Sequence, residues 1–294
     1  MPDYILDLRK IVGHRPLIQV GASILVEDGE GKILLQRRKD NHCWGYAGGS
    51  AGLDENVEDA TRRELFEETG LAAGQIELFG VFSGREMHYV YPNGDEVSNV
   101  DIVYICKDFS GELEKQESEV EELKFFDIRH LPEEISPPAR PALKKWIEER
   151  KNTINDICIR FASTGFSTSG DKRIKDISEK GVQKIIENVR DGKYKSLYLS
   201  LNPDGEIDGY KYFTMESDDN WIAVQVADEE NSVFYSSFDV NYMDSDEESP
   251  IECSDGQSVI LKKYTMHDRE LAADCAEWFI RTGGHYPGME WLKS

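Results

Sequence analysis

Long apolar runs, paired cysteines and excess basic charge are all missing from this sequence. No run approaches the roughly 20 apolar residues that a helix needs to cross a bilayer, and the N-terminus has no signal-peptide pattern. The five cysteines are scattered, odd in number and without CxxC spacing, which predicts neither a disulfide framework nor a zinc site. We therefore expect a reduced, cytoplasmic protein.

Positive charge is scarce along the whole chain, whose formal net charge is −23 at pH 7. Residues 1–150 hold 18 basic and 30 acidic side chains, and the remaining residues hold 16 and 27, so the imbalance is spread evenly. Such a field repels nucleic acid and anionic membranes, which makes DNA and membranes poor partners. An anionic nucleotide can bind only where metal ions and a few local arginines screen this field.

Three glutamates at helical spacing stand out in residues 49–71, GSAGLDENVEDATRRELFEETGL. Spacings of three and four place Glu64, Glu67 and Glu68 on one face of a helix. Like charges arranged in this way repel each other by roughly 0.2–0.5 kcal/mol per pair. Either an open, solvated face tolerates this repulsion, or a hard cation such as Mg²⁺ offsets it.

The same 23 residues read G-x5-E-x7-R-E-U-x-E-E-x-G-U, where U is apolar, and every defined position is filled. This pattern resembles the signature of the Nudix hydrolases, which cleave nucleoside diphosphates linked to another moiety. The resemblance covers about residues 16–150. It implies an α/β/α sandwich around a mixed sheet and binding of Mg²⁺ or Mn²⁺ by the three glutamates. It also implies that Arg63 holds the glutamates in place and that Gly49 lets the backbone approach the metal.

The local sequence around the glutamates is consistent with a helix that has well-defined ends. Asn56 is a suitable N-cap, and Gly70 is a suitable residue to end the helix. We expect Val57, Ala60 and Leu65 to face the sheet, which would leave the carboxylates exposed.

Four residues outside this stretch are candidates for substrate binding. Arg37 and Arg38 end a predicted strand, where they either reach a substrate phosphate or remain solvated. Trp44 either stacks on a base or packs in the core. Tyr89, beside His88, lies about 16 to 18 positions past the signature. In the family, tyrosine at that distance suggests diadenosine polyphosphates, and proline, which is absent here, suggests ADP-ribose.

An acidic run at residues 117–122, ESEVEE, precedes a predicted strand. Members of the family often supply a further glutamate at this place, as a metal ligand or general base. Glu119 is the first candidate and Glu122 the second, with a plain charged loop as the alternative.

Apolar runs and turn signals predict the remaining elements of the first half. A glycine-rich turn at residues 28–31 predicts a hairpin between two strands, and Asn93-Gly94 predicts another. The expected helices are 2–12 and 142–151, and the expected strands are 16–27, 32–38, 76–82, 86–91, 96–106 and 123–128.

A boundary is expected near residues 152–155, which divides the chain into residues 1–152 and 153–294. The second part is predicted to be an α+β domain with an antiparallel sheet. Its expected loop is 163–170, its helices are 177–190 and 268–282, and its strands are 154–162, 196–201, 210–215, 221–227, 233–240 and 258–264. The tail, WFIRTGGHYPGMEWL, faintly resembles immunity domains of the Imm1 kind.

These features together predict a metal-dependent pyrophosphohydrolase with an accessory domain of unknown role. Members of the family often form dimers, so a homodimer is a further expectation. The substrate would be ADP-ribose, a nucleotide sugar or a dinucleoside polyphosphate. One alternative is hydrolysis of nucleoside triphosphates or RNA ends. A second is an immunity or protein-binding factor in which the hydrolase domain is accessory, and a third is a ligand sensor without catalysis.

Overall fold

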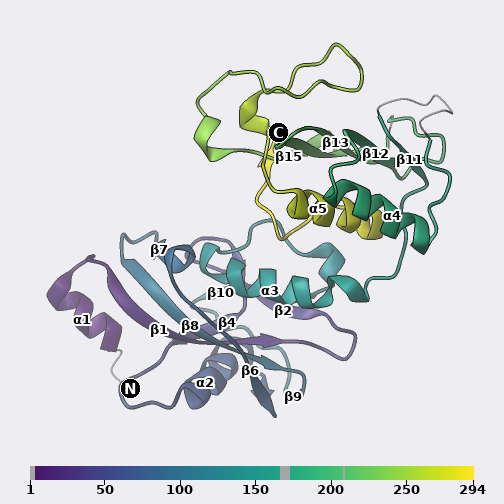
Figure 1. Ribbon diagram of the computed structural model, residues 1–294. Helices are drawn as coiled ribbons and strands as arrows, with labels where there is room; N and C mark the ends of the chain where they lie inside the picture. Colours follow the sequence, from purple (N-terminus) through teal and green to yellow (C-terminus); the bar gives the residue numbers. More distant parts are fainter. Residues whose placement is uncertain (1–3, 166–172, 208) are drawn as a thin grey trace. The chain divides into compact units, whose positions relative to one another are not determined.

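The chain forms two compact units, Met1–Glu149 and Arg150–Ser294, in this computed structural model (Figure 1). The structure describes residues 4–165, 173–207 and 209–294. Among these residues, no helix is both long enough and apolar enough to cross a membrane.

A mixed sheet forms the centre of the N-terminal unit, with strand order β4-β1-β8-β6 and β7 paired to β8. β1 and β8 run parallel over ten residue pairs, and the other neighbours are antiparallel. The expected hairpin around Asn93-Gly94 is confirmed by the β7–β8 pair. The strands are β1 Leu17–Val26, β4 Ala47–Ser50, β6 Ile76–Phe82, β7 His88–Val90 and β8 Glu96–Cys106.

The other predicted hairpin is wrong, because β2 leaves β1 and enters a different sheet. Across the turn, the bridge between Glu27 and Ile33 and the hydrogen bond from the N–H of Asp28 to the carbonyl of Lys32 do not extend into a ladder between the two strands. β2 instead lies between β10 and β3 in a three-stranded antiparallel sheet. These strands are β2 Ile33–Arg38, β3 Trp44–Gly45 and β10 Val120–Phe126, and a short pair is formed by β5 Ala72–Ala73 and β9 Phe109–Ser110.

The α-helices in the described part of this unit are α1 Tyr4–Val12, α2 Val57–Thr69 and α3 Arg140–Arg150. α2 packs against β1 and β4 and contributes Leu65 to the core between these elements. α3 buries Trp146, whose indole nitrogen donates to the buried carboxylate of Glu27 over 2.9 Å. The core around Leu65 also contains Ile24, Val26, Leu34, Ala47, Leu71 and Cys106.

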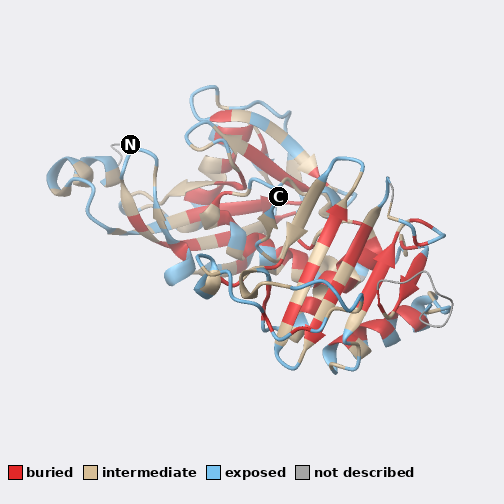
Figure 2. Cartoon of the chain, turned by 90° about the horizontal axis from the view of Figure 1, so that it is seen from above, coloured by how far each residue is buried: buried red, intermediate tan, exposed pale blue. Residues whose placement is uncertain are grey.

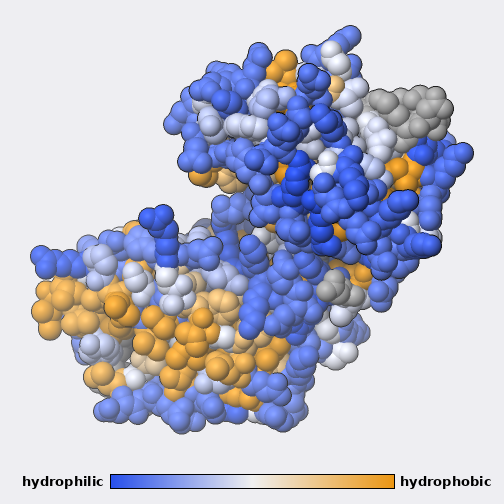
Figure 3. Space-filling view, in the orientation of Figure 1, coloured by the Kyte–Doolittle hydropathy of each residue, from blue (hydrophilic) through white to orange (hydrophobic). Residues whose placement is uncertain are grey.

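Large apolar side chains also remain exposed on the N-terminal unit (Figure 3). Ile18 on β1 is 78% exposed, and Leu78 and Val81 on β6 are also exposed. These residues alternate with inward-facing neighbours along their strands. No helix of the described part of the unit therefore covers this region of the sheet.

The C-terminal unit is built on one antiparallel sheet with strand order β11-β12-β13-β14-β15-β16. α4 Glu179–Arg190 and α5 Arg269–Thr282 pack against each other, and α5 packs against β13 and β14. Buried and half-buried residues alternate along the strands, as Figure 2 shows. The strands are β11 Phe161–Ser163, β12 Ser196–Ser200, β13 Lys211–Asp218, β14 Trp221–Asp228, β15 Val233–Ser236 and β16 Leu292–Lys293. The predicted fold class, a mixed sheet with helices followed by an antiparallel α+β part, is confirmed.

Three predicted strands of this unit differ from the structure; one of them, 233–240, ends at Ser236 and is followed by a 3-10 helix, Val240–Tyr242. The strand expected at 154–162 is reduced to Phe161–Ser163, and the strand expected at 258–264 contains instead a short 3-10 helix, Lys262–Tyr264. The edge strand Leu292–Lys293 was not predicted, because two residues carry no alternating pattern. The loop predicted at 163–170 lies partly outside the described residues.

Candidate active site

The signature stretch folds as strand β4, a loop and helix α2. The side chain of Asn56 accepts a hydrogen bond from the backbone N–H of Glu58 over 2.9 Å, which caps the helix as predicted. Gly70 adopts a left-handed conformation with φ of 73°, and its N–H donates to the carbonyl of Phe66. Both ends of the helix that carries the glutamates are therefore held by local hydrogen bonds.

Arg63 lies at the centre of the acidic cluster. Its guanidinium donates two hydrogen bonds to Glu55, over 2.8 and 3.0 Å, and one each to Glu64 and Glu67, over 2.7 and 3.1 Å. The hydrogen bonds from Arg63 lower the pKa of Glu55 to about 2. Arg63 therefore contacts three carboxylates of the cluster at once, and it does not line the adjoining cavity.

The three glutamates of the helix lie in different environments. The side chain of Glu67 is 50% exposed and that of Glu64 is 15% exposed, whereas Glu68 is only 4% exposed. The expectation that all the carboxylates are exposed is therefore wrong for Glu68. Ala60 and Leu65 are buried as expected, and Val57 is half-buried.

Glu68 is buried with hydrogen-bond donors on one of its oxygens. Its Oε2 accepts from the side-chain amide of Gln36 over 2.9 Å and from the backbone N–H of Gly48 over 2.8 Å. Burial raises the pKa of Glu68 to about 8, and the nearby charge of Glu64 acts in the same direction. Gln36, which sequence reasoning missed, therefore holds one of the key glutamates from the neighbouring sheet.

Gly49 lies against the carboxylate of Glu64. A side chain at position 49 would place its Cβ 2.5–2.6 Å from the carboxylate atoms of Glu64, so only glycine fits there. Burial raises the pKa of Glu64, and the charges of Glu67 and Glu119 raise it further. The side chain of Glu119 is exposed, and its charge acts on Glu64 from the turn before β10.

That turn is attached to the end of α2 by its backbone. The N–H groups of Glu114 and Gln116 donate to the carbonyls of Thr69 and Glu68. This attachment brings the loop that carries Glu119 to the glutamate helix, although some fifty residues separate the two in sequence. Glu122, the second candidate, lies inside β10 opposite Arg37, because the strand begins at Val120 rather than at the predicted residue 123.

The donor chemistry of this cluster fits a hard divalent cation. Carboxylate oxygens are the ligands that Mg²⁺ and Mn²⁺ prefer, and close like charges gain from a cation between them. Within the described residues, no three such groups converge around one point, because Arg63 bridges Glu64 and Glu67. The residues therefore fit the ion by chemistry and charge, while the oxygens of Glu55, Glu64 and Glu67 are gathered here around the guanidinium of Arg63.

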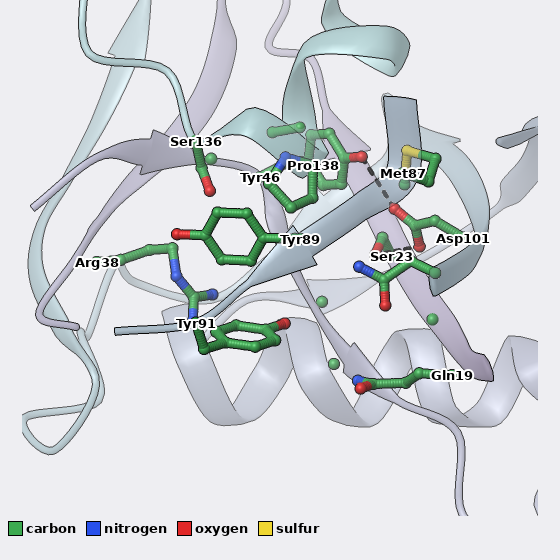
Figure 4. Close-up of a pocket in the computed structure, with 16 residues that line it drawn as sticks. Gln19, Ser23, Arg38, Tyr46, Met87, Tyr89, Tyr91, Asp101, Ser136 and Pro138 are labelled. Atoms are coloured by element: carbon green, nitrogen blue, oxygen red, sulfur yellow. Dashed lines mark hydrogen bonds between the residues drawn. The ribbon is translucent and has the colours of Figure 1, made fainter. Parts of the chain in front are cut away.

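A cavity of about 100 Å³ adjoins the cluster through Gly48 and Gly49, which belong to its lining (Figure 4). Arg38 and Tyr89, two of the predicted substrate-binding residues, both belong to its lining. Arg38 also forms a bidentate ion pair with Asp40, in which its Nε donates to Oδ1 over 2.9 Å and its Nη2 to Oδ2 over 2.8 Å. Further polar and aromatic lining comes from Gln19, Ser23, Tyr46, Tyr91, Asn99, Asp101 and Ser136.

Two predicted substrate-binding residues do not reach this cavity. Arg37 alternates with Arg38 along β2, so it points to the other side of the strand, where it pairs with Glu121 at 3.4 Å. Trp44 is buried and packs edge-on against Phe126 with ring centroids 4.8 Å apart. The core alternative for Trp44 is therefore the correct one, and two residues further on Tyr46 lines the cavity instead.

A buried polar network at the cavity was not predicted from the sequence. Asp101 accepts hydrogen bonds from the hydroxyls of Ser23, over 2.7 Å, and Tyr46, over 2.9 Å. Burial raises the pKa of Asp101. Opposite it, a Cβ on Gly21 would lie 2.6 Å from the Asp101 carboxylate. Gly21 interrupts the apolar residues of β1, and Asp101 interrupts those of β8. These two interruptions were the sequence signals that could have revealed this site.

Comparisons with known proteins agree with this geometry. Residues 17–148 match the model of the NUDIX domain. The chain is 32% identical over 121 residues to a "MutT-like protein" of Streptomyces ambofaciens, and this match covers 41% of the chain and 69% of that relative. The chain belongs to the Nudix hydrolase family.

Other Nudix relatives are matched over a smaller part of their length. An "ADP-ribose pyrophosphatase" of Methanocaldococcus jannaschii is 39% identical over 106 residues, which is 35% of this chain and 59% of that relative. A "NAD-capped RNA hydrolase NudC" of Actinobacillus succinogenes is 28% identical over 140 residues, which is 45% of this chain and 49% of that relative.

Proposed function

We propose that this Nudix protein is a metal-dependent pyrophosphohydrolase that cleaves the diphosphate linkage of a nucleoside diphosphate joined to another moiety. The observation that carries the proposal is the contact between the glutamate cluster and the cavity. Gly48 and Gly49 line the cavity, while Glu68 accepts from the N–H of Gly48 and Glu64 lies against Gly49. A diphosphate in this cavity would therefore lie beside the carboxylates.

Glu64, Glu67, Glu68 and the backbone of Gly49 would hold Mg²⁺ or Mn²⁺. The bound ion would supply charge neutralisation and an activated water. Hydrolysis forms a bond from the water oxygen to one phosphorus and breaks one phosphorus–oxygen bond of the anhydride. The two products are phosphomonoesters, one from each side of the diphosphate. One carboxylate takes the proton of the water, and Glu119 is the candidate for this role, as general base or as a further ligand.

Arg63 and Arg38 have separate roles in this proposal. Arg63 positions Glu64 and Glu67 without touching the substrate, because its hydrogen bonds go to carboxylates and to one backbone carbonyl, that of Ser50. Arg38 would bind a substrate phosphate from the rim of the cavity. Asp40 accepts hydrogen bonds from two guanidinium nitrogens of Arg38 and would hold this side chain in place.

The decisive test is a metal-dependent activity screen of the full chain. The panel contains ADP-ribose, nucleotide sugars, dinucleoside polyphosphates, nucleoside triphosphates and capped RNA ends, each with Mg²⁺, Mn²⁺ or EDTA. We expect metal-dependent release of two phosphate products from a diphosphate-linked substrate, and loss of turnover by orders of magnitude in Glu68→Gln. Unchanged turnover in that variant would contradict the proposal. Preference for triphosphates or RNA ends would favour the first alternative.

The role of the second half stays a prediction. We propose that residues 1–152 form the hydrolase domain and 153–294 an accessory domain, in a cytoplasmic protein whose five cysteines are free. Full activity of residues 1–152 together with the absence of any captured partner would support an accessory role. Specific binding of one protein by the full chain, lost in residues 1–152, would favour the immunity or partner-binding alternative. Sedimentation of the full chain tests the proposed homodimer.

A further inference from the structure

The cavity has two chemically different ends. Arg38 lies near Tyr89 and Tyr91 at one end, and Asp101 and Ser23 lie away from them in the view of Figure 4. Arg38 is the cationic group of the lining, and Asp101 is its carboxyl group. A phosphate is attracted to the first end and repelled from the second. The phosphates therefore suit the space between Arg38 and Glu68, on which the charge of Arg38 acts, and a neutral part of the substrate suits the space beside Asp101.

Asn99 belongs to the end that contains Asp101. The two residues alternate along β8, so both side chains point to the same side of the sheet. Asn99 is buried, with an exposed fraction of only 8%, and it lines the cavity. Within the part of the chain that the structure describes, its carboxamide has no hydrogen-bond partner in the protein, and its polar atoms are open to the cavity rather than enclosed.

Gln19, the residue paired with Asn99 on β1, also carries an amide, but that amide has a partner within the protein. Gln19 stands opposite Asn99 in the β1–β8 register, and its amide donates to the hydroxyl of Ser50 over 2.6 Å. One amide of the cavity lining is thus satisfied within the protein, and the other is not. A carboxamide that faces a cavity without a protein partner is available to hydrogen-bond a ligand in place of water.

A flat, neutral ligand fits between these groups. Tyr89 and Tyr91 place aromatic rings in the lining, with centroids 4.9 Å apart and planes at 83° to each other. Bases bind to aromatic rings by stacking, and an asparagine side chain pairs with a base edge through one donor and one acceptor. Asp101 already accepts from two hydroxyls, so it favours a further donor over an oxo group.

We propose, on the basis of the function proposed above, that Asn99 and Asp101 select an adenine base in the substrate of this Nudix protein. The carboxamide of Asn99 pairs with the 6-amino group and a ring nitrogen of adenine. Asp101 disfavours bases that carry an oxo group at the same position. Asn99 is thus a specificity-determining residue, distinct from the glutamates that carry out hydrolysis.

The test measures binding of two nucleotides to the full-length protein in EDTA by calorimetry. AMP and IMP differ chiefly in the 6-amino and 6-oxo groups. We expect AMP to bind about 10- to 100-fold more tightly than IMP, the range that one good bidentate pair provides. In Asn99→Leu this preference should fall below about 3-fold, since the side chain keeps its size and loses both hydrogen bonds.

Two further variants keep the test decisive. Asn99→Asp keeps the shape of the side chain and removes only its donor, so it replaces Asn99→Leu if that variant does not fold. Ser98→Ala is the matched control, because Ser98 is the next residue on β8 and is absent from the lining of this cavity. Equal binding of AMP and IMP by the wild type, or an unchanged preference in both Asn99 variants, overturns the inference.

Hydrolysis separates this inference from the function on which it rests. With Mg²⁺, kcat/KM for ADP-ribose should exceed that for its hypoxanthine analogue by a similar factor in the wild type. Hydrolysis of both compounds at equal rates overturns the adenine assignment and leaves the pyrophosphohydrolase proposal intact. Selective binding of AMP without hydrolysis of any panel compound supports the base site and overturns the pyrophosphohydrolase proposal.

Discussion

The two units of this chain arrange their acidic side chains in contrasting ways. In the N-terminal unit, Glu55, Glu64 and Glu67 share the single guanidinium of Arg63. In the C-terminal unit, Arg190 and Arg281 each pair with two acidic residues, and other acidic residues have separate basic partners. The pairs there include Lys195–Asp218, Lys211–Asp228, Lys262–Glu247 and Lys263–Asp246.

Separate pairs neutralise charge locally, and exposed pairs of this kind contribute little to stability. A shared arginine instead keeps several carboxylates close together despite their repulsion. Carboxylates held this close together provide the oxygen ligands that a divalent cation such as Mg²⁺ binds. The contrast teaches that spacing of charges, rather than their number, distinguishes the candidate site in an evenly acidic chain.

Among the substitutions that test this difference between the units, Glu67→Gln is expected to have the largest effect on turnover. The side chain of Glu67 is half-exposed, so the fold should remain intact, while turnover should fall by about 1,000-fold or more because a charged group of the cluster is lost. Glu252→Gln, in the C-terminal unit and away from the cluster in the sequence, is the matched control and should leave kcat unchanged. Steady-state kinetics with saturating Mg²⁺ measure both, and equal rates in the two variants would contradict the contrast.

The pH dependence of stability should differ between the two units. The pKa of Glu68 in the folded protein is about 8, against an ordinary value of 4.5, so the native protein keeps a proton that the unfolded chain releases between these values. With respect to this group, metal-free wild-type protein should therefore be most stable below about pH 4.5. Its free energy of unfolding should fall by roughly 4 kcal/mol or less as the pH rises to 8.

Glu68→Gln should remove this slope, as measured by urea unfolding in EDTA from pH 5 to 9. Glu216→Gln, in β13 of the C-terminal unit, should flatten the profile less, because Glu216 is only half-buried although burial raises its pKa in the same direction. A Glu68→Gln profile parallel to that of the wild type would show that Glu68 is ionised in the folded protein at neutral pH.

Two arginines sharpen the comparison further. Arg63→Lys keeps the charge but loses the planar fork that grips Glu55, and kcat/KM should fall about 10- to 100-fold. Arg281 forms a similar fork with Glu179 and joins α5 to α4. Arg281→Lys should lower the melting temperature by a few degrees and leave kcat/KM unchanged. Loss of activity in Arg281→Lys of the same size would refute this separation of roles.

The smallest expected difference concerns the glycines that end α2 and α5. Gly70 and Gly283 have φ of 73° and 71°, so alanine at either position should cost about 1 kcal/mol of the free energy of unfolding. A Cβ on Gly70 would also lie 2.7 Å from the backbone oxygen of Glu112, whereas one on Gly283 meets only the side chain of Leu201 at 3.0 Å. Gly70→Ala should therefore be the more destabilising, by about 1 kcal/mol in chemical denaturation.

Local patterns predicted the signature helix well. Its cap at Asn56, its end at Gly70 and the separation of Ala60 and Leu65 from the glutamates all depend on residues within one or two turns. The pairing of strands in a sheet depends less on local sequence. The predicted hairpin between β1 and β2 failed because the parallel partner of β1, β8, lies some eighty residues further along the chain.

The sequence by itself determined that a helix carries three neighbouring glutamates and Arg63, because helical spacing is a local property. Only the tertiary structure decided that Glu68 is buried, that Arg38 rather than Arg37 reaches the cavity, and that Asn99 and Asp101 line it. Burial and direction depend on which strands pair and on which face of each strand is covered. Those choices are made by contacts between segments that are distant in the sequence, so no local pattern records them.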